Sequence, residues 1–322
     1  MKYISLFCFV LTGCATPDTR LPDIGADKRF AEQSKQVAAA FDEMHRLRTR
    51  LRRVAAPILR ENAGLCRKTR PVAGILTKTV NDFSEALQDE AREGRGIDDE
   101  PTVVHVLGDS PANRAGIKVR DRLQTPEGDY LSSHGKDFEQ RLAAGEEIVI
   151  LRHGKRIDNV VISPEIHCDY RLKLKMTPKI NAYATGKSII VTSGMMNFTQ
   201  SDEELAYIIG HELAHNTHGH IRKIVSNFVL SLFQTKYIRL FEAEADYVGL
   251  YYVARAGYTL DGIEEIWTRL ARLSTKPIYK AGTHPTYPDR FVLIAATREE
   301  IKTKQATGQP LLPNPGNDNK SR

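Results

Sequence analysis

The sequence lacks an apolar run long enough to cross a bilayer, and it lacks a block rich in lysine and arginine. The N-terminal apolar run at residues 3–11 is far below the ~20 residues that a membrane-spanning helix needs. The formal charge of +6 is a mild basic excess over abundant acids and bases. Such a balance is typical of a mixed, solvated surface, so we predict no nucleic-acid partner. No internal repeat is present, and 322 residues are enough for two domains.

The short N-terminal apolar run has the features of a removable export signal. Lys2 supplies the positive charge in front of it, and Leu-Thr-Gly-Cys at 11–14 resembles the cleavage box of bacterial lipoproteins. That resemblance implies loss of residues 1–13 and a lipid on Cys14, which would anchor the protein to a membrane. Alanine rather than aspartate after this cysteine implies the outer membrane, facing the periplasm. The alternative is an unprocessed leader. Residues 14–26 are expected to form a tether.

Cysteine is scarce, and the position of each of the four cysteines predicts what becomes of it. Cys8 would leave with the export signal, and Cys14 would carry the lipid. Cys66 and Cys168 remain as an even pair in an oxidising compartment, which predicts a disulfide between them. Two buried thiols are the alternative, because nothing near either cysteine has the spacing of metal ligands.

Residues 27–61 carry apolar side chains at intervals of three, four or seven, which predicts one long helix. Its other face carries a run of arginines, for which a solvated surface is the simplest interpretation and contact with anionic lipid is the alternative. Residues 305–322, rich in Pro, Asn and Gly, are predicted to be disordered. The helical stripe comprises Phe30, Val37, Phe41, Met44, Leu51, Val54 and Ile58, and the arginines are Arg46, Arg48, Arg50, Arg52 and Arg53.

Residues 67–166 have a β-rich pattern. The stretch PTVVHVL predicts a strand, a helix is expected near residues 136–144, and two β-rich runs about a His-Gly-Lys turn at 146–165 predict a hairpin. With the stretch SPANRAGIKVRDRL, this order resembles a PDZ domain, although Arg120 stands where that family usually has glycine. The resemblance implies binding of extended peptides by strand addition. The alternative is a structural β-module without a ligand.

The segment HELAHNTHGH at 211–220 holds four histidines and one glutamate. The Ser-x-x-Glu at 201–204, before an apolar run, is a capping-box pattern, so a helix should begin there and continue through the histidines. His211 and His215 would lie one turn apart on one face, where both can reach one ion. Glu212 lies between them in angle, able to contact a water without binding the metal. This is the HExxH arrangement of zinc metallopeptidases.

The third ligand separates two kinds of zinc site. The pattern HExxHxxGxxH would need glycine at 218 and histidine at 221, but the chain has His218 and Ile221, one residue out of register. A glutamate from a second helix is the other option, and the sequence EAEAD supplies it. Glu242 and Asp246 share a face at i and i+4, whereas Glu244 points away. Glu242 is therefore the predicted third ligand, and Asp246 is predicted to orient a ligand histidine.

The combination of HELAH, the ExxxD pair and Thr283-His284-Pro285 resembles the HtpX and CAAX-protease-like family of gluzincin metallopeptidases. The resemblance extends from residue 167 to about residue 295, and the lipoprotein signal is similar to that of LoiP-like periplasmic members. It implies one zinc ion per chain, held by His211, His215 and Glu242, with Glu212 as general base and acid and Asp246 beside a ligand histidine.

The same resemblance implies two further roles. His284 would steady the oxyanion, and Asn181, Ala182 and Tyr183 would belong to an edge strand that pairs with substrate. A strand that merely packs is the alternative for the latter. His218 and His220 are expected at the helix end or beside the ligand histidines, outside the ligand set.

These patterns predict an α+β chain with a mainly helical zincin-type domain, a small β-sheet edge and an inserted PDZ-like domain. Because Cys66 and Cys168 flank the insertion, the catalytic domain would consist of residues 27–66 and 167–304. The predicted function is a zinc-dependent endopeptidase of envelope proteins, active in quality control at the periplasmic face of the outer membrane. The alternative is a lipoprotein adaptor or chaperone with little hydrolysis. Protein substrates and a lipid anchor are the expected partners, and the oligomeric state stays open.

Overall fold

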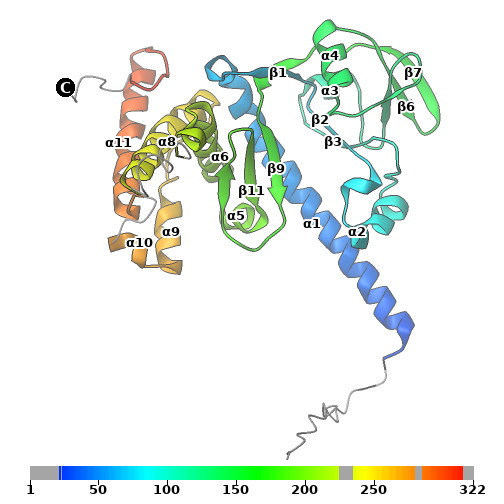
Figure 1. Cartoon of the computed structure of the whole chain (residues 1–322), viewed down its shortest axis with the longest axis horizontal. Coiled ribbons are helices and arrows are strands. Elements are labelled where there is room, and N and C mark those ends of the chain that lie inside the picture. Colours follow the sequence, from blue (N-terminus) through cyan, green and yellow to red (C-terminus); the bar gives the residue numbers. More distant parts are fainter. Residues whose placement is uncertain (1–21, 23, 225–234, 280–284, 315–322) are drawn as a thin grey trace, which may run out of the picture.

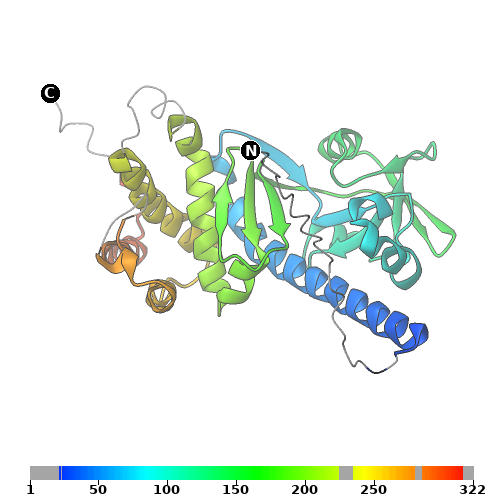
Figure 2. The same cartoon turned by 60° about the horizontal axis from the view of Figure 1, so that its bottom comes forward.

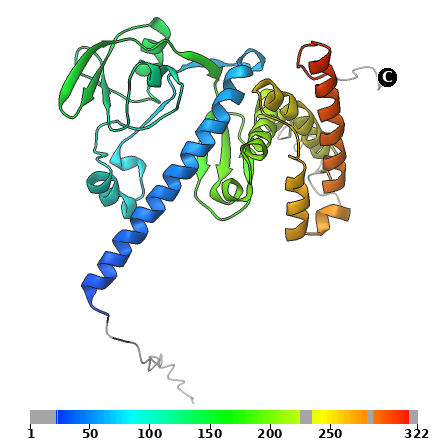
Figure 3. The ribbon, with the colours of Figure 1, turned by 180° about the vertical axis from the view of Figure 1, so that it is seen from behind.

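The structure, a computed structural model, describes residues 22, 24–224, 235–279 and 285–314. It has an α+β fold, as the sequence predicts, in which the long helix α1 (Ala26–Glu61) separates a β-rich part from a mainly helical part. Figures 1 and 3 show the two parts on opposite sides of this helix, from the front and from behind. No helix within the described ranges is both long and apolar enough to cross a membrane.

The helix α1 packs only through the C-terminal part of its apolar stripe. Burial begins at Phe41 and recurs every three or four residues as far as Ile58 and Leu59. Residues 26–36 are exposed, and Phe30 is 71% exposed. The stripe therefore has the predicted period, but its first three turns contribute no core.

The arginines of α1 are not all on the solvated face that the sequence favours. Arg50 donates to Asp202 Oδ1 at 3.0 Å and to the carbonyl oxygen of Ser201 at 2.7 Å, both in the helical part. Arg52 donates to Ile75 O at 2.8 Å, in the β-rich part. These two side chains therefore join α1 to its neighbours on either side, which the sequence pattern alone does not reveal.

The β-rich part is built on an antiparallel sheet with the order β2-β3-β4-β6-β7, in which β5 pairs with β4. The predicted hairpin is formed by β6 and β7, and α4 forms at the residues predicted for a helix. The PDZ-like character of residues 67–166, called the inserted module below, stays a prediction. Its elements are β1 (Thr69–Val72), β2 (Ile75–Lys78), η2 (Val80–Asp82), α2 (Glu85–Asp89), η3 (Glu90–Gly94), β3 (Thr102–Val106), α3 (Pro111–Arg114), β4 (Arg122–Gln124), β5 (Tyr130–Leu131), α4 (Lys136–Ala144), β6 (Ile148–Arg152) and β7 (Lys155–Val160), and β8 (Glu165–Cys168) runs out of it.

The helical part combines a three-stranded sheet with a set of packed helices. The strand order is β10-β11-β9, with β9 parallel and β10 antiparallel to β11, so β10 is an edge strand. Figure 2 shows these strands lying beside α6, and one large apolar core joins them to α1. The elements are η1 (Ala63–Leu65), β9 (Arg171–Lys175), β10 (Ala182–Ala184), β11 (Ser188–Thr192), α5 (Ser193–Phe198), α6 (Asp202–Thr217), α8 (Thr235–Arg255), α9 (Glu265–Leu273), α10 (Lys276–Tyr279) and α11 (Tyr287–Ala306).

A disulfide holds the two ends of the inserted module together. Cys66 and Cys168 are bonded, with their Cα atoms 5.6 Å apart. Beside the bond, β1 and β8 pair as antiparallel strands, with Thr69 opposite Cys168. The chain therefore leaves the helical part and returns to it at one place.

The C-terminal tail departs from the prediction of disorder over its described residues, 305–314. Beyond α11 the chain folds back, so that Lys304 Nζ donates to Leu312 O at 2.7 Å. The backbone N–H of Asn314 then donates to the Tyr247 hydroxyl at 2.9 Å, and its side-chain amide donates to Glu300 at 2.8 Å. These contacts supply the ordering that composition alone does not predict.

Candidate metal centre

The helix α6 begins where the capping pattern places it. The Ser201 side chain accepts a hydrogen bond from the backbone N–H of Glu204 at 3.2 Å, and the first turn is acidic, which suits the positive end of the helix dipole. The Glu204 carboxylate in turn accepts from the backbone N–H of Gln200 at 2.8 Å. Every residue from Glu204 to Thr217 is buried, so the HELAH segment lies inside the protein.

Two glycines let the backbones of α6 and α8 touch. A Cβ on Gly210 of α6 would lie 2.7 Å from Gly249 O, and one on Gly249 of α8 would lie 2.8 Å from His211 N. Both distances are too short for a real side-chain carbon, so each position requires glycine. This close approach brings the acidic residues of α8 within reach of the histidines of α6.

Three side chains with metal-binding atoms converge between these helices. The Nε2 atoms of His211 and His215 are 3.1 Å apart, and the carboxylate of Glu242 lies 3.4 Å from each of them. All three side chains are buried, and their donor atoms lie within 4.8 Å of one another. Zinc–ligand bonds of about 2.0–2.1 Å in a tetrahedral arrangement separate neighbouring ligand atoms by about 3.3 Å. The set therefore fits a zinc ion in both chemistry and spacing.

Asp246 lies against the outer nitrogen of one of these histidines, as the sequence predicts. His211 Nδ1 is 2.8 Å from Asp246 Oδ1, the Tyr207 hydroxyl donates to the same oxygen at 2.7 Å, and Arg290 Nε donates to Oδ2 at 2.7 Å. Burial would raise the pKa of Asp246, but the charges of Arg290 and His211 outweigh it and hold the pKa well below its usual range. The carboxylate therefore stays ionised and turns His211 Nε2 towards Glu242.

Arg290 and Tyr207 are the members of this network to which the sequence patterns gave no role. Arg290 is buried and its guanidinium stacks on the Trp267 ring, 3.8 Å from the centroid. A usable signal was present, because Arg290 lies in the first turn of α11, where the helix dipole disfavours a cation. An arginine at such a position calls for a buried anion, and Asp246 supplies it.

The two histidines expected outside the ligand set lie near it. His220 is fully buried, with its Nδ1 3.1 Å from His215 Nδ1 and its Nε2 3.0 Å from Glu244. Helical spacing predicts that Glu244 points away from the metal-binding atoms, and it is not part of the converging set. Its carboxylate contacts His220 instead, which in turn contacts His215. His218 contacts Thr217 at 3.1 Å, and its ring lies beside that of His220, with the centroids 5.7 Å apart.

Glu212 faces the small sheet. Burial raises its pKa to about 7, and a backbone hydrogen bond from Ala184 partly opposes this. Ala184 belongs to the edge strand β10, which contains Ala182 and Tyr183 and follows Asn181 directly. Asn181 and Thr185, on either side of β10, form backbone hydrogen bonds with residues at the two ends of β11. Because hydrogen-bonded and non-hydrogen-bonded residues alternate along an antiparallel strand, the backbone groups of Ala182 and Ala184 face away from β11, towards the open edge. The edge strand and the buried glutamate are therefore adjacent.

Two residues to which the sequence assigns a role, Cys14 and His284, lie outside the described residues.

A family comparison covers the part of the chain that holds this cluster. The model of Peptidase family M48 matches residues 160–235 and 223–298. Among curated proteins, the mitochondrial metalloendopeptidase OMA1 of Arabidopsis thaliana is 29% identical over 143 residues, which cover 37% of this chain and 29% of the relative. A putative beta-barrel assembly-enhancing protease of Vibrio cholerae is 28% identical over 150 residues, covering 35% of this chain and 31% of that protein. The chain thus spans under a third of each relative.

A solved structure described as the HtrA-type protease AlgW with decapeptide aligns at 24% identity, covering 31% of this chain and 29% of that one. Its TM-score of 0.22 is too low to establish a shared fold. The family match, the two protease relatives and the buried His–His–Glu set inside the matched region agree with one another. Residues 160–298 are thus similar to peptidase family M48, and this part of the chain holds His211, His215 and Glu242.

Proposed function

We propose that this chain is a zinc-dependent endopeptidase that cleaves bacterial envelope proteins, in quality control at the periplasmic face of the outer membrane. The observation that carries the proposal is the buried set of His211, His215 and Glu242: the two histidine Nε2 atoms are 3.1 Å apart, and each lies 3.4 Å from one of the two carboxylate oxygens of Glu242. The protease relatives support the reaction class, and the Vibrio protein, named for β-barrel assembly, supports the envelope as the source of substrates.

The residues around these three side chains match the needs of peptide hydrolysis. Zinc held by these three side chains would supply a Lewis acid that polarises the peptide carbonyl. Glu212, with a pKa of about 7, can take the proton of the attacking water and return it to the leaving amine. The open edge of β10 can pair with the substrate backbone, which would bring the scissile bond alongside Glu212. We also propose that His284 stabilises the oxyanion, because the His-Pro sequence resembles that of the metallopeptidase family.

Cleavage of casein by the purified chain tests this function. Glu212→Gln removes the proton acceptor while keeping the side-chain shape, so we expect cleavage to fall at least ~100-fold with zinc content unchanged. Glu203→Gln, on the first turn of the same helix, is the matched control and should cleave like the wild type. Equal activity in Glu212→Gln, or wild-type protein purified without zinc, would refute the proposal.

The third ligand is tested by metal content. Glu242→Ala should lose zinc, whereas Glu244→Ala should still bind it at saturating concentrations, because only Glu242 faces the two histidines. Zinc retained by Glu242→Ala and lost by Glu244→Ala would reverse the assignment.

The proposed location depends on Cys14 and the Leu-Thr-Gly-Cys sequence that it ends. Expression in a bacterial host should label the wild type, but not Cys14→Ser, with radioactive palmitate. A wild-type chain that remains unlabelled and fractionates with soluble periplasmic proteins would contradict a lipid anchor.

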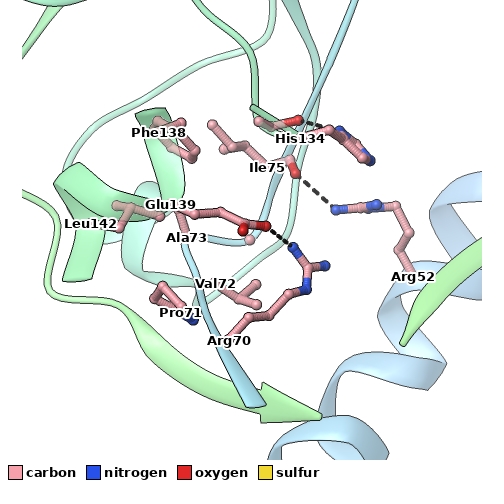
Figure 4. Close-up of a pocket in the computed structure, with 12 residues that line it drawn as sticks. Arg52, Arg70, Pro71, Val72, Ala73, Ile75, His134, Phe138, Glu139 and Leu142 are labelled. Atoms are coloured by element: carbon pink, nitrogen blue, oxygen red, sulfur yellow. Dashed lines mark hydrogen bonds and ion pairs between the residues drawn. The ribbon is translucent and has the colours of Figure 1, made fainter. Parts of the chain in front are cut away.

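Peptide binding by the inserted module is a second candidate function, because β2 is the edge strand of its sheet. A cavity of about 30 Å³ lies beside this edge, and Figure 4 shows Arg52 and Arg70 entering it opposite the helix α4. The Nε atom of Arg52 is buried there without a hydrogen-bond partner among the described residues. An anionic group on a peptide would supply that partner.

The same edge is already occupied by side chains of this chain. Arg52 donates to Ile75 O at 2.8 Å, and the Thr77 backbone N–H donates to Ser133 Oγ at 2.9 Å. Because these are the groups that an added strand would use, hydrolysis is favoured over recruitment as the main function. Fluorescence anisotropy with a peptide library would decide: weaker binding by Arg52→Met than by the wild type is expected if the module binds peptides through this cavity, and no binding by the wild type excludes it.

A further inference from the structure

The outer nitrogens of the two candidate ligand histidines are held in different ways. His211 Nδ1 contacts the carboxylate of Asp246 directly, at 2.8 Å. His215 Nδ1 instead contacts a second imidazole, His220 Nδ1, at 3.1 Å. The outer nitrogen of His220, Nε2, lies 3.0 Å from Glu244 Oε2. Each ligand histidine is therefore linked to a carboxylate: His211 directly to Asp246, and His215 through the ring of His220 to Glu244.

The hydrogen-bonding partners determine which nitrogen of His220 and of His215 carries a hydrogen. Glu244 is a carboxylate and accepts, so His220 must carry its hydrogen on Nε2. A neutral His220 then offers a lone pair at Nδ1. The 3.1 Å contact is a hydrogen bond only if His215 carries its own hydrogen on Nδ1. His215 is thereby left with a lone pair on Nε2, which is the atom that faces His211 and Glu242.

The packing around His220 leaves the ring little freedom to turn. The ring is fully buried, stacks on Phe241 with centroids 4.9 Å apart and meets the His215 ring edge-on at 5.1 Å. Gly219, with a φ of +65°, turns the chain at the end of α6 and brings His220 back over His215. Glu244 lies at the outer end, with 44% of its side chain exposed.

We propose that His220 and Glu244 are positioning residues that hold His215 in the tautomer and orientation needed to bind zinc. The inference rests on the proposed zinc site. All three acids of the sequence EAEAD then have a task there: Glu242 binds the ion, Asp246 orients His211, and Glu244 orients His215 through His220. Outer partners of this kind typically change metal affinity by roughly 10–100-fold.

Zinc affinity, measured on the full chain by competition with a chromophoric chelator, tests the inference. We expect Glu244→Ala and His220→Phe to weaken zinc binding by roughly 10–100-fold. Glu244→Gln keeps an acceptor oxygen for His220, so its affinity should lie between those of the wild type and Glu244→Ala. Glu203→Ala is the control for loss of a glutamate and should bind like the wild type.

Thermal unfolding of the metal-free proteins separates positioning from general stability. Wild type, Glu244→Ala and Glu244→Gln should unfold at similar temperatures, since Glu244 lies at the surface end of the arrangement. If the wild type binds zinc and Glu244→Ala binds it equally well, the inference is overturned and the zinc site stands. If Glu244→Gln binds zinc as weakly as Glu244→Ala, the carboxylate acts by charge alone, and the proposed positioning of His215 through hydrogen bonds is wrong. A wild type that binds no zinc removes the proposed function itself.

Discussion

At the scale of single residues, Arg290 and Asp246 form a buried ion pair beside the candidate site. Arg290 donates through Nε and through a second nitrogen, and both side chains are almost completely removed from solvent. Breaking a buried pair by removing one partner leaves the other charge without compensation. The network therefore contributes to the stability of the fold as well as to the orientation of His211.

We predict that Arg290→Met lowers the free energy of unfolding of the metal-free protein by about 3–5 kcal/mol, because Asp246 loses its counter-charge inside the protein. Urea unfolding in the presence of EDTA measures this. Arg46→Met is the control, since Arg46 forms an exposed pair with Glu43 and its loss should cost less than about 1 kcal/mol. Equal effects of the two substitutions would contradict the prediction.

His105 gives the contact between α1 and the inserted module a dependence on pH. Burial, and then the nearby charge of Arg52, lower its pKa to about 4; His45 and Arg48 act in the same direction. Above pH 6.5 the folded and unfolded chains are both neutral at this residue. Between pH 6.5 and 4 only the unfolded chain binds the proton, so stability is lost as the pH falls.

We therefore predict that the wild type loses about 3 kcal/mol of unfolding free energy at about pH 4 relative to about pH 7.5 through His105 alone. His105→Gln should remove this share of the dependence, and the difference between the two urea-unfolding profiles isolates it from other groups. Parallel profiles across this range would show that His105 is not kept neutral by the fold.

The sequence identifies the candidate site's inner residues better than its surroundings. His211, Glu212 and His215 follow from helical spacing within one short segment, and Glu242 follows from the same spacing in the next helix. Arg290 was assigned no role and His220 no specific partner, because their contacts are set by the crossing of helices and by the turn at the end of α6. Such contacts depend on tertiary distances, which a one-dimensional pattern does not contain.

At the scale of elements, the crossing of α6 and α8 determines whether the donor atoms meet. The two backbones touch at Gly210 and Gly249, and Glu242 lies two helical turns before Gly249 on α8. A side chain at either glycine would have to displace backbone atoms of the other helix. The spacing of the donor atoms therefore depends on two residues that carry no reactive group.

We predict that Gly249→Ala costs about 1–3 kcal/mol of stability, because its Cβ would lie 2.8 Å from His211 N and force the helices apart. The same displacement should weaken zinc binding, measured by chelator competition. Gly64→Ala is the control, because nothing lies within 4 Å of its added Cβ. If Gly249→Ala keeps wild-type stability and zinc affinity, the crossing tolerates a wider spacing and the prediction is wrong.

Element prediction succeeded where local signals were strong and failed where packing decided. The hairpin of β6 and β7 and the helix α4 have clear turn and cap signals, and α1 has a regular apolar period. The role of Arg50 was missed because an arginine on a helix face is usually solvated. Here it reaches Asp202 and Ser201 at the start of α6, which are 152 and 151 residues away in sequence.

At the scale of the whole molecule, the Cys66–Cys168 bond makes the inserted module a closed loop with a sequence separation of 102. We predict that the double substitution Cys66→Ser, Cys168→Ser lowers the free energy of unfolding by about 4 kcal/mol, since a loop of ~100 residues regains its freedom in the unfolded chain. Urea unfolding of the two proteins measures this. A reductant should destabilise the wild type and leave the double variant unchanged; insensitivity of both would contradict the prediction.

The exposed N-terminal part of α1 determines how far the packed part of the protein lies from the N-terminus of the helix. Packing begins at Phe41, so residues 26–40 extend the helix by about 22 Å before the first buried side chain. A helical segment of this length that buries no side chain completely is only marginally stable in water, so it would shorten or bend under little force. If Cys14 carries a lipid, this segment and the residues before it set how far above the membrane the proposed peptidase site can reach. Polypeptides that extend to that height would be within its range, and those that lie on the bilayer surface would not.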